Sequence, residues 1–144
     1  MKECKFCRII WGDLPSSRVF EDDLVCALLD IHPINPGHTL VIPRCHVCAF
    51  TDLNSDEVVQ LSLVAKRMAF ALKASLPDCE GVSLSLADGE AAGQEIPHAH
   101  LHVIPRQAGD GFGWRRYGRD QSKPELDAMA ERIRSKSGED SGAD

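Results

Sequence analysis

One long stretch of this chain has apolar residues at helical spacing. Its apolar positions recur every three or four residues, which predicts a long helix that buries a single stripe. Acids and capping side chains in residues 52–57 favour a helix start there, and Pro77 and Gly81 favour its end. The stripe consists of Leu61, Val64, Ala65, Met68, Leu72 and Leu76.

The other periodic segments are short and have a period of two or continuous apolar character, which predicts strands. Asp22 and Asp23 separate the first two of them, which favours a tight hairpin. A short helical turn is expected near residues 5–11 and a short amphipathic helix at 124–133. The predicted strands are residues 19–21, 24–31, 38–42, 82–87 and 98–106.

These elements together predict an α+β fold, with an antiparallel sheet of about five strands, one long helix and short flanking helices. We expect a single domain over residues 1–134, since no repeat or second core pattern is visible. Residues 135–144 are small and charged, which is typical of a disordered tail.

Composition restricts the function classes. The chain has 144 residues, 43% of them hydrophobic, and a formal net charge of -6, which argues against binding to a nucleic-acid backbone. Neither a signal peptide nor an apolar run of about 20 residues is visible, so a soluble cytoplasmic protein with no membrane partner is expected. Its six cysteines are then expected to be reduced thiols or metal ligands.

Three histidines alternate with apolar residues in the last predicted strand. His98, His100 and His102 are expected on one face, with Ala99, Leu101 and Val103 on the other. Stacked imidazoles contribute little to a core, so a chemical use is favoured over packing. Imidazole can act as a metal ligand, a general acid or base, or a nucleophile.

The segment His98-Ala-His-Leu-His-Val-Ile104 closely resembles the signature of the histidine-triad (HIT) family of nucleotide hydrolases and transferases. The loop at residues 89–94 and the strand pair at residues 28–31 and 36–44 also resemble those of the family. The resemblance covers residues 3 to 106 in order and spacing, and the tail only loosely.

The resemblance implies an enzyme that attacks the α-phosphate of a nucleotide. His100 matches the nucleophile, which forms a nucleotidyl-histidine intermediate. His102 matches the residue that contacts the phosphate and assists the leaving group. His38 matches a fourth histidine that supports the nucleophile from the neighbouring strand.

Further matches imply a nucleotide-binding surface. Asp30 matches the acid that accepts hydrogen bonds from ribose hydroxyls, although at a strand end it could simply cap a turn. Gln94, with Gly93 and Glu95, matches the loop that binds the α-phosphate, although Gln94 could instead face solvent. The apolar wall that would enclose the base, or would otherwise be plain core, comprises Phe6, Ile9 and Ile31.

Two positions depart from the family pattern. Ala87 stands eleven residues before the first triad histidine, where many members have an asparagine near the phosphate. Glu95 stands where several members have serine or threonine near the leaving group. A carboxylate there would repel a polyphosphate and suit a cationic amine.

The spacing Cys4-x-x-Cys7 indicates half of a zinc site, which needs two more ligands. Some bacterial HIT proteins resemble this arrangement, and the resemblance implies a structural Cys2His2 zinc bound by Cys4, Cys7, His46 and His98. A site with four cysteine ligands, Cys4 and Cys7 together with Cys45 and Cys48, remains open on spacing alone. A catalytic metal held by the triad itself is disfavoured, because successive positions on one strand face suit chelation by two rings better than by three.

These expectations give a hydrolase or transferase that cleaves a purine nucleoside phosphoramidate or a dinucleoside polyphosphate through His100, without a redox cofactor. The alternative is a nucleotide-binding or scaffold protein with little turnover, which Ala87 and Glu95 keep open. The resemblance also implies a homodimer joined through the long helix and the sheet edges.

Overall fold

The computed structural model describes residues 3–113 and 118–137. Within them, the predicted α+β class is confirmed, because a single antiparallel sheet is combined with one long helix and short helices. In chain order the elements are α1 (Lys5–Ile10), β1 (Arg18–Glu21), β2 (Val25–Leu29), β3 (Thr39–Pro43), η1 (Phe50–Asp52), α2 (Ser55–Ser75), β4 (Gly81–Ser85), η2 (Glu90–Ala92), β5 (Leu101–Arg106) and α3 (Lys123–Arg134).

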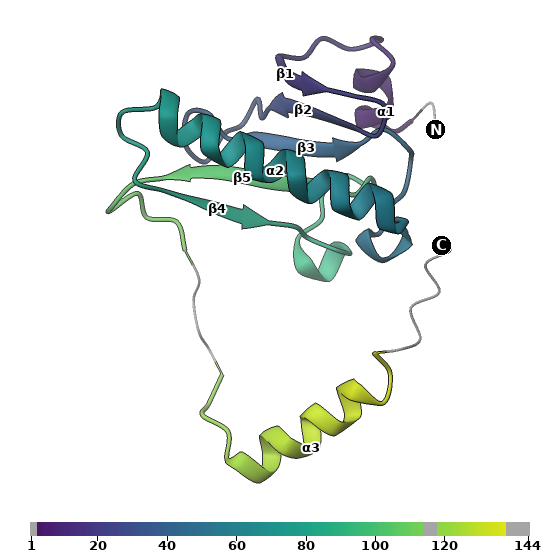
Figure 1. Ribbon diagram of the computed structural model, residues 1–144, viewed down its shortest axis with the longest axis vertical. Helices are drawn as coiled ribbons and strands as arrows, with labels where there is room; N and C mark the ends of the chain where they lie inside the picture. Colours follow the sequence, from purple (N-terminus) through teal and green to yellow (C-terminus); the bar gives the residue numbers. More distant parts are fainter. Residues whose placement is uncertain (1–2, 114–117, 138–144) are drawn as a thin grey trace.

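The five strands are ordered β1-β2-β3-β5-β4, and every neighbouring pair is antiparallel (Figure 1). The predicted hairpin between β1 and β2 is confirmed. Its turn is held by the Asp22 carboxylate, which accepts hydrogen bonds from the backbone N–H groups of Leu24 and Val25 at 2.8 Å each. β1 and β4 form the two edges of the sheet.

Helix α2 covers one face of the sheet (Figure 1). It begins with a capping box, in which the side chain of Asn54 accepts from the N–H of Glu57 while the Glu57 carboxylate accepts from the N–H of Asn54. Its buried side chains are Leu61, Val64, Ala65, Met68 and Leu72, five of the six predicted, while Leu76 is partly buried. These residues pack on Val25, Val41 and Val103 of the sheet.

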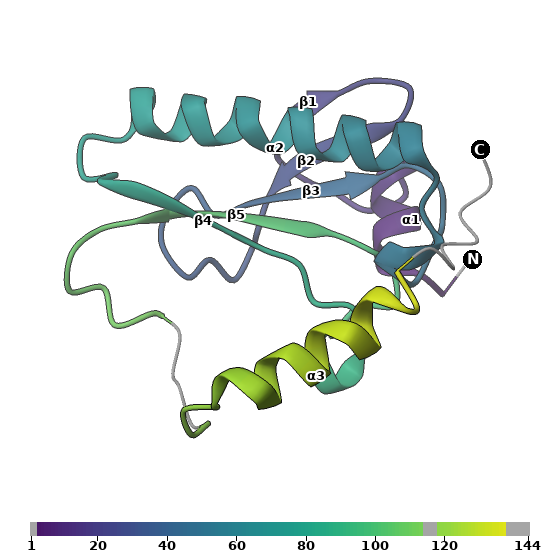
Figure 2. The same cartoon turned by 60° about the horizontal axis from the view of Figure 1, so that its bottom comes forward.

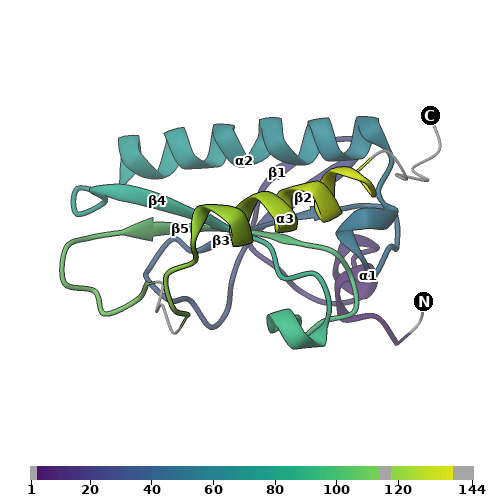
Figure 3. The same ribbon diagram turned by 90° about the horizontal axis from the view of Figure 1, so that it is seen from below.

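Helix α1 lies on the opposite face, as Figures 2 and 3 show. Its Phe6, Ile9 and Ile10 pack against Leu28 and Ile42 of the central strands. Because successive strand residues point to opposite faces, β2 and β3 are buried on both sides. This double burial explains why both strands are continuous apolar runs in the sequence.

The histidine segment differs from the predicted strand at its start. β5 begins at Leu101, because its pairing with β3 starts where Leu101 faces Val41. Ala99 instead donates its N–H to the carbonyl of Val47. The expected alternation persists nonetheless: Ala99, Leu101 and Val103 belong to the core under α2.

Helix α3 confirms the predicted C-terminal helix and also starts with a capping box, formed by Ser122 and Glu125. None of its residues is buried, and it lies apart from the sheet in Figure 1. Of the predicted disordered tail, residues 138–144 lie outside the described residues. Within the described ranges, every helix is too short or too polar to cross a membrane.

Candidate functional site

A cavity of about 620 Å³ lies between α1, the loop after β2 and the segment that leads into β5. One part of its wall is apolar, and the other part carries ionisable side chains. The apolar part includes Phe6, Ile9, Leu14, Leu28, Leu40 and Ile96. The ionisable part includes Lys5, Asp30, His38, Glu95, His100 and His102.

His100 has a defined tautomer. Its Nδ1 atom lies 2.8 Å from the carbonyl oxygen of His98, and a carbonyl can only accept a hydrogen bond. Nδ1 of His100 therefore carries the proton, and the neutral ring has its free lone pair on Nε2. The ring is 6% exposed and packs edge-on against Phe6 at a centroid distance of 5.0 Å. An oriented, unprotonated imidazole nitrogen is what nucleophilic catalysis requires.

His38 and His102 form a hydrogen-bonded pair whose tautomers can also be assigned. The backbone N–H of Ile34 donates to Nδ1 of His38 at 3.1 Å, so the proton of neutral His38 is on Nε2. This Nε2 lies 2.9 Å from Nδ1 of His102, which must accept. His102 consequently carries its own proton on Nε2.

Both rings of this pair are neutral near pH 7. Burial lowers the pKa of His38, while the nearby Asp30 carboxylate partly opposes that effect. Burial, together with the charges of His100 and His38, lowers the pKa of His102 to about 4. A neutral His102 with a proton on Nε2 can donate to a phosphate oxygen or a leaving group.

Asp30 has two roles in the geometry. One carboxylate oxygen accepts from the backbone N–H of His32 at 2.8 Å, which is the turn-capping arrangement. The other lies 3.7 Å from Nε2 of His38. The side chain lines the cavity as expected, and its remaining acceptor capacity suits hydroxyl donors.

In the loop before the triad, the side chain of Gln94 makes hydrogen bonds to the surrounding backbone. Oε1 of Gln94 accepts from the N–H of Gly89, and its Nε2 donates to the carbonyls of Cys48 and Ile96. The amide of Gln94 therefore holds the loop in shape, and its contact with a phosphate stays a prediction. Gly93 and Glu95 line the cavity, and the Glu95 side chain is exposed.

The three predicted wall residues all line the cavity, but their environments differ. Phe6 and Ile9 are buried and also belong to the core cluster around α1. Ile31 is 73% exposed at the rim, so a ligand in the cavity could cover it.

Cys4, Cys7, His46 and His98 bring their ligand atoms together, all within 4.8 Å of one another. The S···N distances are 3.4 Å from Cys4 to His98 and 3.3 Å from Cys7 to His46, and the two Nδ1 atoms lie 3.4 Å apart. Tetrahedral Zn²⁺ with its usual bond lengths has S···N edges of about 3.5 Å and N···N edges of about 3.3 Å. The donor set therefore fits zinc in both chemistry and spacing.

The protonation states of this cluster agree with metal binding. Nε2 of His98 lies 2.8 Å from the carbonyl of Pro43 and must donate to it, which leaves the lone pair of Nδ1 toward the cysteines. Burial and the neighbouring Cys4 thiol raise the pKa of Cys7 to about 11. A bound Zn²⁺ would deprotonate such a thiol outright.

The alternative cysteines take other partners. The Sγ of Cys48 donates to the carbonyl of Pro97 at 3.2 Å. Burial and the neighbouring Glu57 carboxylate raise the pKa of the Cys45 thiol to about 12. In the described part of the chain, neither joins the group around Cys4 and Cys7. The Cys2His2 arrangement is the one that the fold assembles.

A second group, Asp30, His38 and His102, also has ligand atoms within 4.8 Å of one another. Metal binding there would need a lone pair on Nε2 of His38. That atom carries the proton as long as Ile34 donates to Nδ1. The hydrogen bonds thus favour a proton relay over a metal site at this position.

Comparisons with known proteins agree with this geometry. The model of the HIT domain matches residues 12–109. An uncharacterised HIT-like protein of Borreliella burgdorferi is 44% identical over 117 residues, which cover 81% of this chain and 84% of that protein. The chain belongs to the HIT domain family.

Solved structures extend the likeness to the whole fold. A histidine triad nucleotide-binding protein from Candida albicans has a TM-score of 0.85 at 28% identity. The match covers 95% of this chain and 99% of the Candida chain. A zinc-bound histidine triad family protein from Mycobacterium smegmatis has a TM-score of 0.74 at 38% identity. The match covers 93% of this chain and 97% of the Mycobacterium chain.

Sequence reasoning missed one component of the site. The amide of Ile34 determines the tautomers of His38 and His102, yet a backbone N–H leaves no side-chain signal. The turn residues Pro33 and Pro36-Gly37 indicate a loop at this position, but not that one of its amides faces a ring.

Proposed function

We propose that the protein is a nucleotide hydrolase or nucleotidyl transferase that cleaves at the α-phosphate of purine nucleoside phosphoramidates or dinucleoside polyphosphates. One observation carries the proposal: the hydrogen bond from Nδ1 of His100 to the carbonyl of His98 places the free lone pair of the neutral ring on Nε2, and this ring lines the cavity. Membership of the HIT family supports the assignment.

In the first step, Nε2 of His100 attacks the α-phosphorus. The new P–N bond forms as the bond to the leaving group breaks; the departing atom keeps the electron pair of that bond and takes up a proton from solvent, while the Nε2–H of His102 donates a hydrogen bond to it. His38 holds His102 in this orientation, because its own Nε2–H donates to Nδ1 of His102. In the second step, water or another acceptor attacks the phosphorus and the P–N bond breaks. Its electron pair returns to Nε2 of His100, and the proton of the acceptor is released to solvent.

The apolar and the ionisable parts of the cavity wall would bind different parts of the substrate. The purine is placed against Phe6, Ile9 and Ile31, where stacking would cover the exposed side chain of Ile31. The ribose hydroxyls are placed on Asp30 and the phosphate beside Gly93 and the triad. The Glu95 carboxylate at the cavity wall favours an amine leaving group over a polyphosphate.

The alternative, a nucleotide-binding protein with little turnover, is supported by the same Glu95, which would repel an anionic substrate. Ala87 also lacks the amide that many family members have near the phosphate. Release of AMP from adenosine 5′-phosphoramidate separates the two hypotheses, because a binding protein would retain the ligand intact.

We also propose that Cys4, Cys7, His46 and His98 bind a structural Zn²⁺, with no metal taking part in the reaction itself. The cluster ties α1 to the segment that carries His100. Zinc would therefore contribute folding energy and hold one wall of the cavity.

A homodimer is proposed from exposed apolar residues. Val59, Leu63 and Phe70 of α2 are 57%, 55% and 77% exposed and lie within about 40° on one helix face. Leu84, on the neighbouring edge strand β4, is 56% exposed. Exposed apolar side chains on one face of α2 and on an unpaired edge strand favour association with a second copy. A cytoplasmic location agrees with the reduced state of the six cysteines.

The decisive experiment replaces the nucleophile. His100→Ala is expected to reduce kcat for AMP release by at least about a thousandfold, or about 4 kcal/mol of barrier. Alkaline quenching of the wild type with an α-³²P-labelled substrate is expected to trap label on the protein, which the variant lacks. If kcat stays within about tenfold, His100 is not the nucleophile. His32→Ala, a change at the cavity rim, serves as the matched control.

A further inference from the structure

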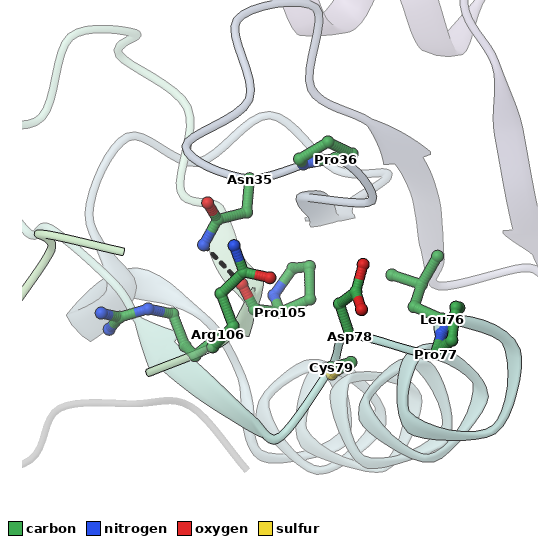
Figure 4. Close-up of a pocket in the computed structure, with 9 residues that line it drawn as sticks. Asn35, Pro36, Leu76, Pro77, Asp78, Cys79, Pro105 and Arg106 are labelled. Carbon is green, nitrogen blue, oxygen red and sulfur yellow. Dashed lines mark hydrogen bonds between the residues drawn. The ribbon is translucent and has the colours of Figure 1, made fainter. Parts of the chain in front are cut away.

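The loop of residues 31–38 separates two hollows. On one side, Ile31, Ile34 and His38 line the candidate site. On the other side, Asn35 and Pro36 line a smaller hollow of about 220 Å³, which Figure 4 shows. The same short loop lines both hollows. The contacts that hold its outer side therefore also position Ile34 and His38 on its inner side.

Asn35 anchors the outer side. Its Nδ2 donates to the carbonyl of Pro105 and to Oδ2 of Asp110, both at 2.9 Å, and Figure 4 shows the bond to Pro105. These two bonds use both protons of the amide nitrogen. They connect the loop to the end of β5 and to the segment after it, which lie 70 and 75 residues further along the chain.

Asp110 is a rigid partner for this amide. Its side chain is only 4% exposed, and its oxygens accept from Nε and Nη2 of Arg106 at 2.6 and 2.5 Å. The N–H groups of Gln107 and Phe112 donate to it at 3.3 and 3.2 Å. A carboxylate held by so many donors is fixed in orientation, so it can position the amide of Asn35.

Short connections lead from Asn35 to the catalytic rings. The carbonyl of Asn35 accepts from the N–H of His38 at 3.0 Å, and the adjacent Ile34 donates to Nδ1 of the same histidine at 3.1 Å. A rotation of this turn would break both bonds. The Nε2–H tautomer of His38, and through it that of His102, would then no longer be imposed.

We propose that Asn35 and Asp110 are positioning residues for His102, the hydrogen-bond donor to the leaving group of the reaction. They hold the 31–38 loop so that the amide of Ile34 keeps His38 in the Nε2–H tautomer, and this leaves the proton of His102 on Nε2, toward the departing group. The inference rests on the proposed function, because it assigns these residues to that reaction. Neither residue touches the cavity that would hold the substrate.

The test combines kinetics with a direct observation of the tautomers. Asn35→Ala, and Asn35→Asp, which has the same shape but lacks the donor, are expected to reduce kcat for adenosine phosphoramidate by about tenfold or more. KM is expected to change by less than about twofold, since the nucleotide contacts remain. Long-range ¹H–¹⁵N spectra should show a single Nε2–H tautomer of His38 in the wild type and a mixture in both variants.

Asn54→Ala is the matched control, because loss of this helix cap costs about 1 kcal/mol of stability far from the loop. It is expected to leave both kcat and the His38 spectrum unchanged. An unchanged spectrum in the Asn35 variants, or a changed spectrum with kcat within twofold, overturns the inference. Absence of turnover in the wild type would instead refute the proposed function, while the spectra would still report on the tautomers.

Discussion

The Nε2 atom of His98 lies 2.8 Å from the carbonyl oxygen of Pro43 at the end of β3. This bond fixes the ring so that Nδ1 faces Cys4 and Cys7, while the carbonyl of the same residue accepts a hydrogen bond from Nδ1–H of His100. One residue thus belongs to the Cys2His2 cluster through its side chain and to the candidate active site through its backbone.

Replacement of a cluster cysteine should remove the metal. Cys7→Ser is expected to reduce zinc, measured by mass spectrometry, from about one to less than one-tenth per chain, and to lower Tm by at least about 5 °C. Cys48→Ser is the control, because this thiol bonds to Pro97 and lies outside the cluster. Loss of zinc in Cys48→Ser would instead support the site with four cysteine ligands.

Gly37 should be intolerant of a side chain for two reasons. Its φ is +97°, and a Cβ there would lie 2.8 Å from Cδ1 of Leu76 and 3.1 Å from Cδ2 of Leu72. Gly37→Ala is expected to reduce the free energy of unfolding by about 2–4 kcal/mol, since backbone strain and overpacking add. Gly12→Ala has a similar φ of +88° with nothing within 4 Å, so it should cost only about 1 kcal/mol. Equal losses of unfolding free energy for Gly37→Ala and Gly12→Ala in urea would show that the contact with Leu72 and Leu76 does not affect stability.

Acid should destabilise the fold through His102. Its pKa is about 4 when folded, against 6.5 for a histidine side chain in an unfolded chain, so between these pH values the unfolded chain binds more protons. The associated stability is complete above pH 6.5 and is lost as the pH falls toward 4, by about 3 kcal/mol at most. His102→Asn retains an acceptor for His38 and should flatten this part of the stability curve. An unchanged slope would assign the effect to other groups.

The proposed dimer should depend on the exposed face of α2. Phe70→Glu is expected to convert the species seen by sedimentation velocity from two chains to one, because a charge would be buried in the interface. Leu126→Glu, at an exposed apolar position of α3, is the control and should leave the mass unchanged. A wild-type monomer at micromolar concentration would refute the proposal.

Periodicity was sufficient to predict most of the fold. The stripe of α2 and the buried runs of β2 and β3 follow from residue spacing alone, because helices and strands have different periods. The start of β5 could not be predicted in this way. Alternation describes which side Ala99 faces, but not that its N–H pairs with Val47 instead of β3. Ladder partners are a property of the assembled sheet.

The site was predictable where residue types are chemically distinctive. The two cysteines and two histidines of the cluster meet as the resemblance implied. Roles that depend on hydrogen-bond partners were not visible, as Gln94 illustrates: its side chain binds three backbone groups of its surroundings. Asn35 was likewise indistinguishable from an ordinary turn residue, since its partner Asp110 is 75 residues away.

The double involvement of His98 has a consequence for molecules that have not acquired their metal. If the cluster binds zinc as proposed, a chain without the metal would lose the bond to the ring of His98, and the peptide that accepts the hydrogen bond from His100 would lose its anchor on the same side. We therefore expect a metal-free chain to become inactive while α2 and its core are still folded. Activity would then be confined to fully matured molecules, and no separate inhibitor would be needed during assembly.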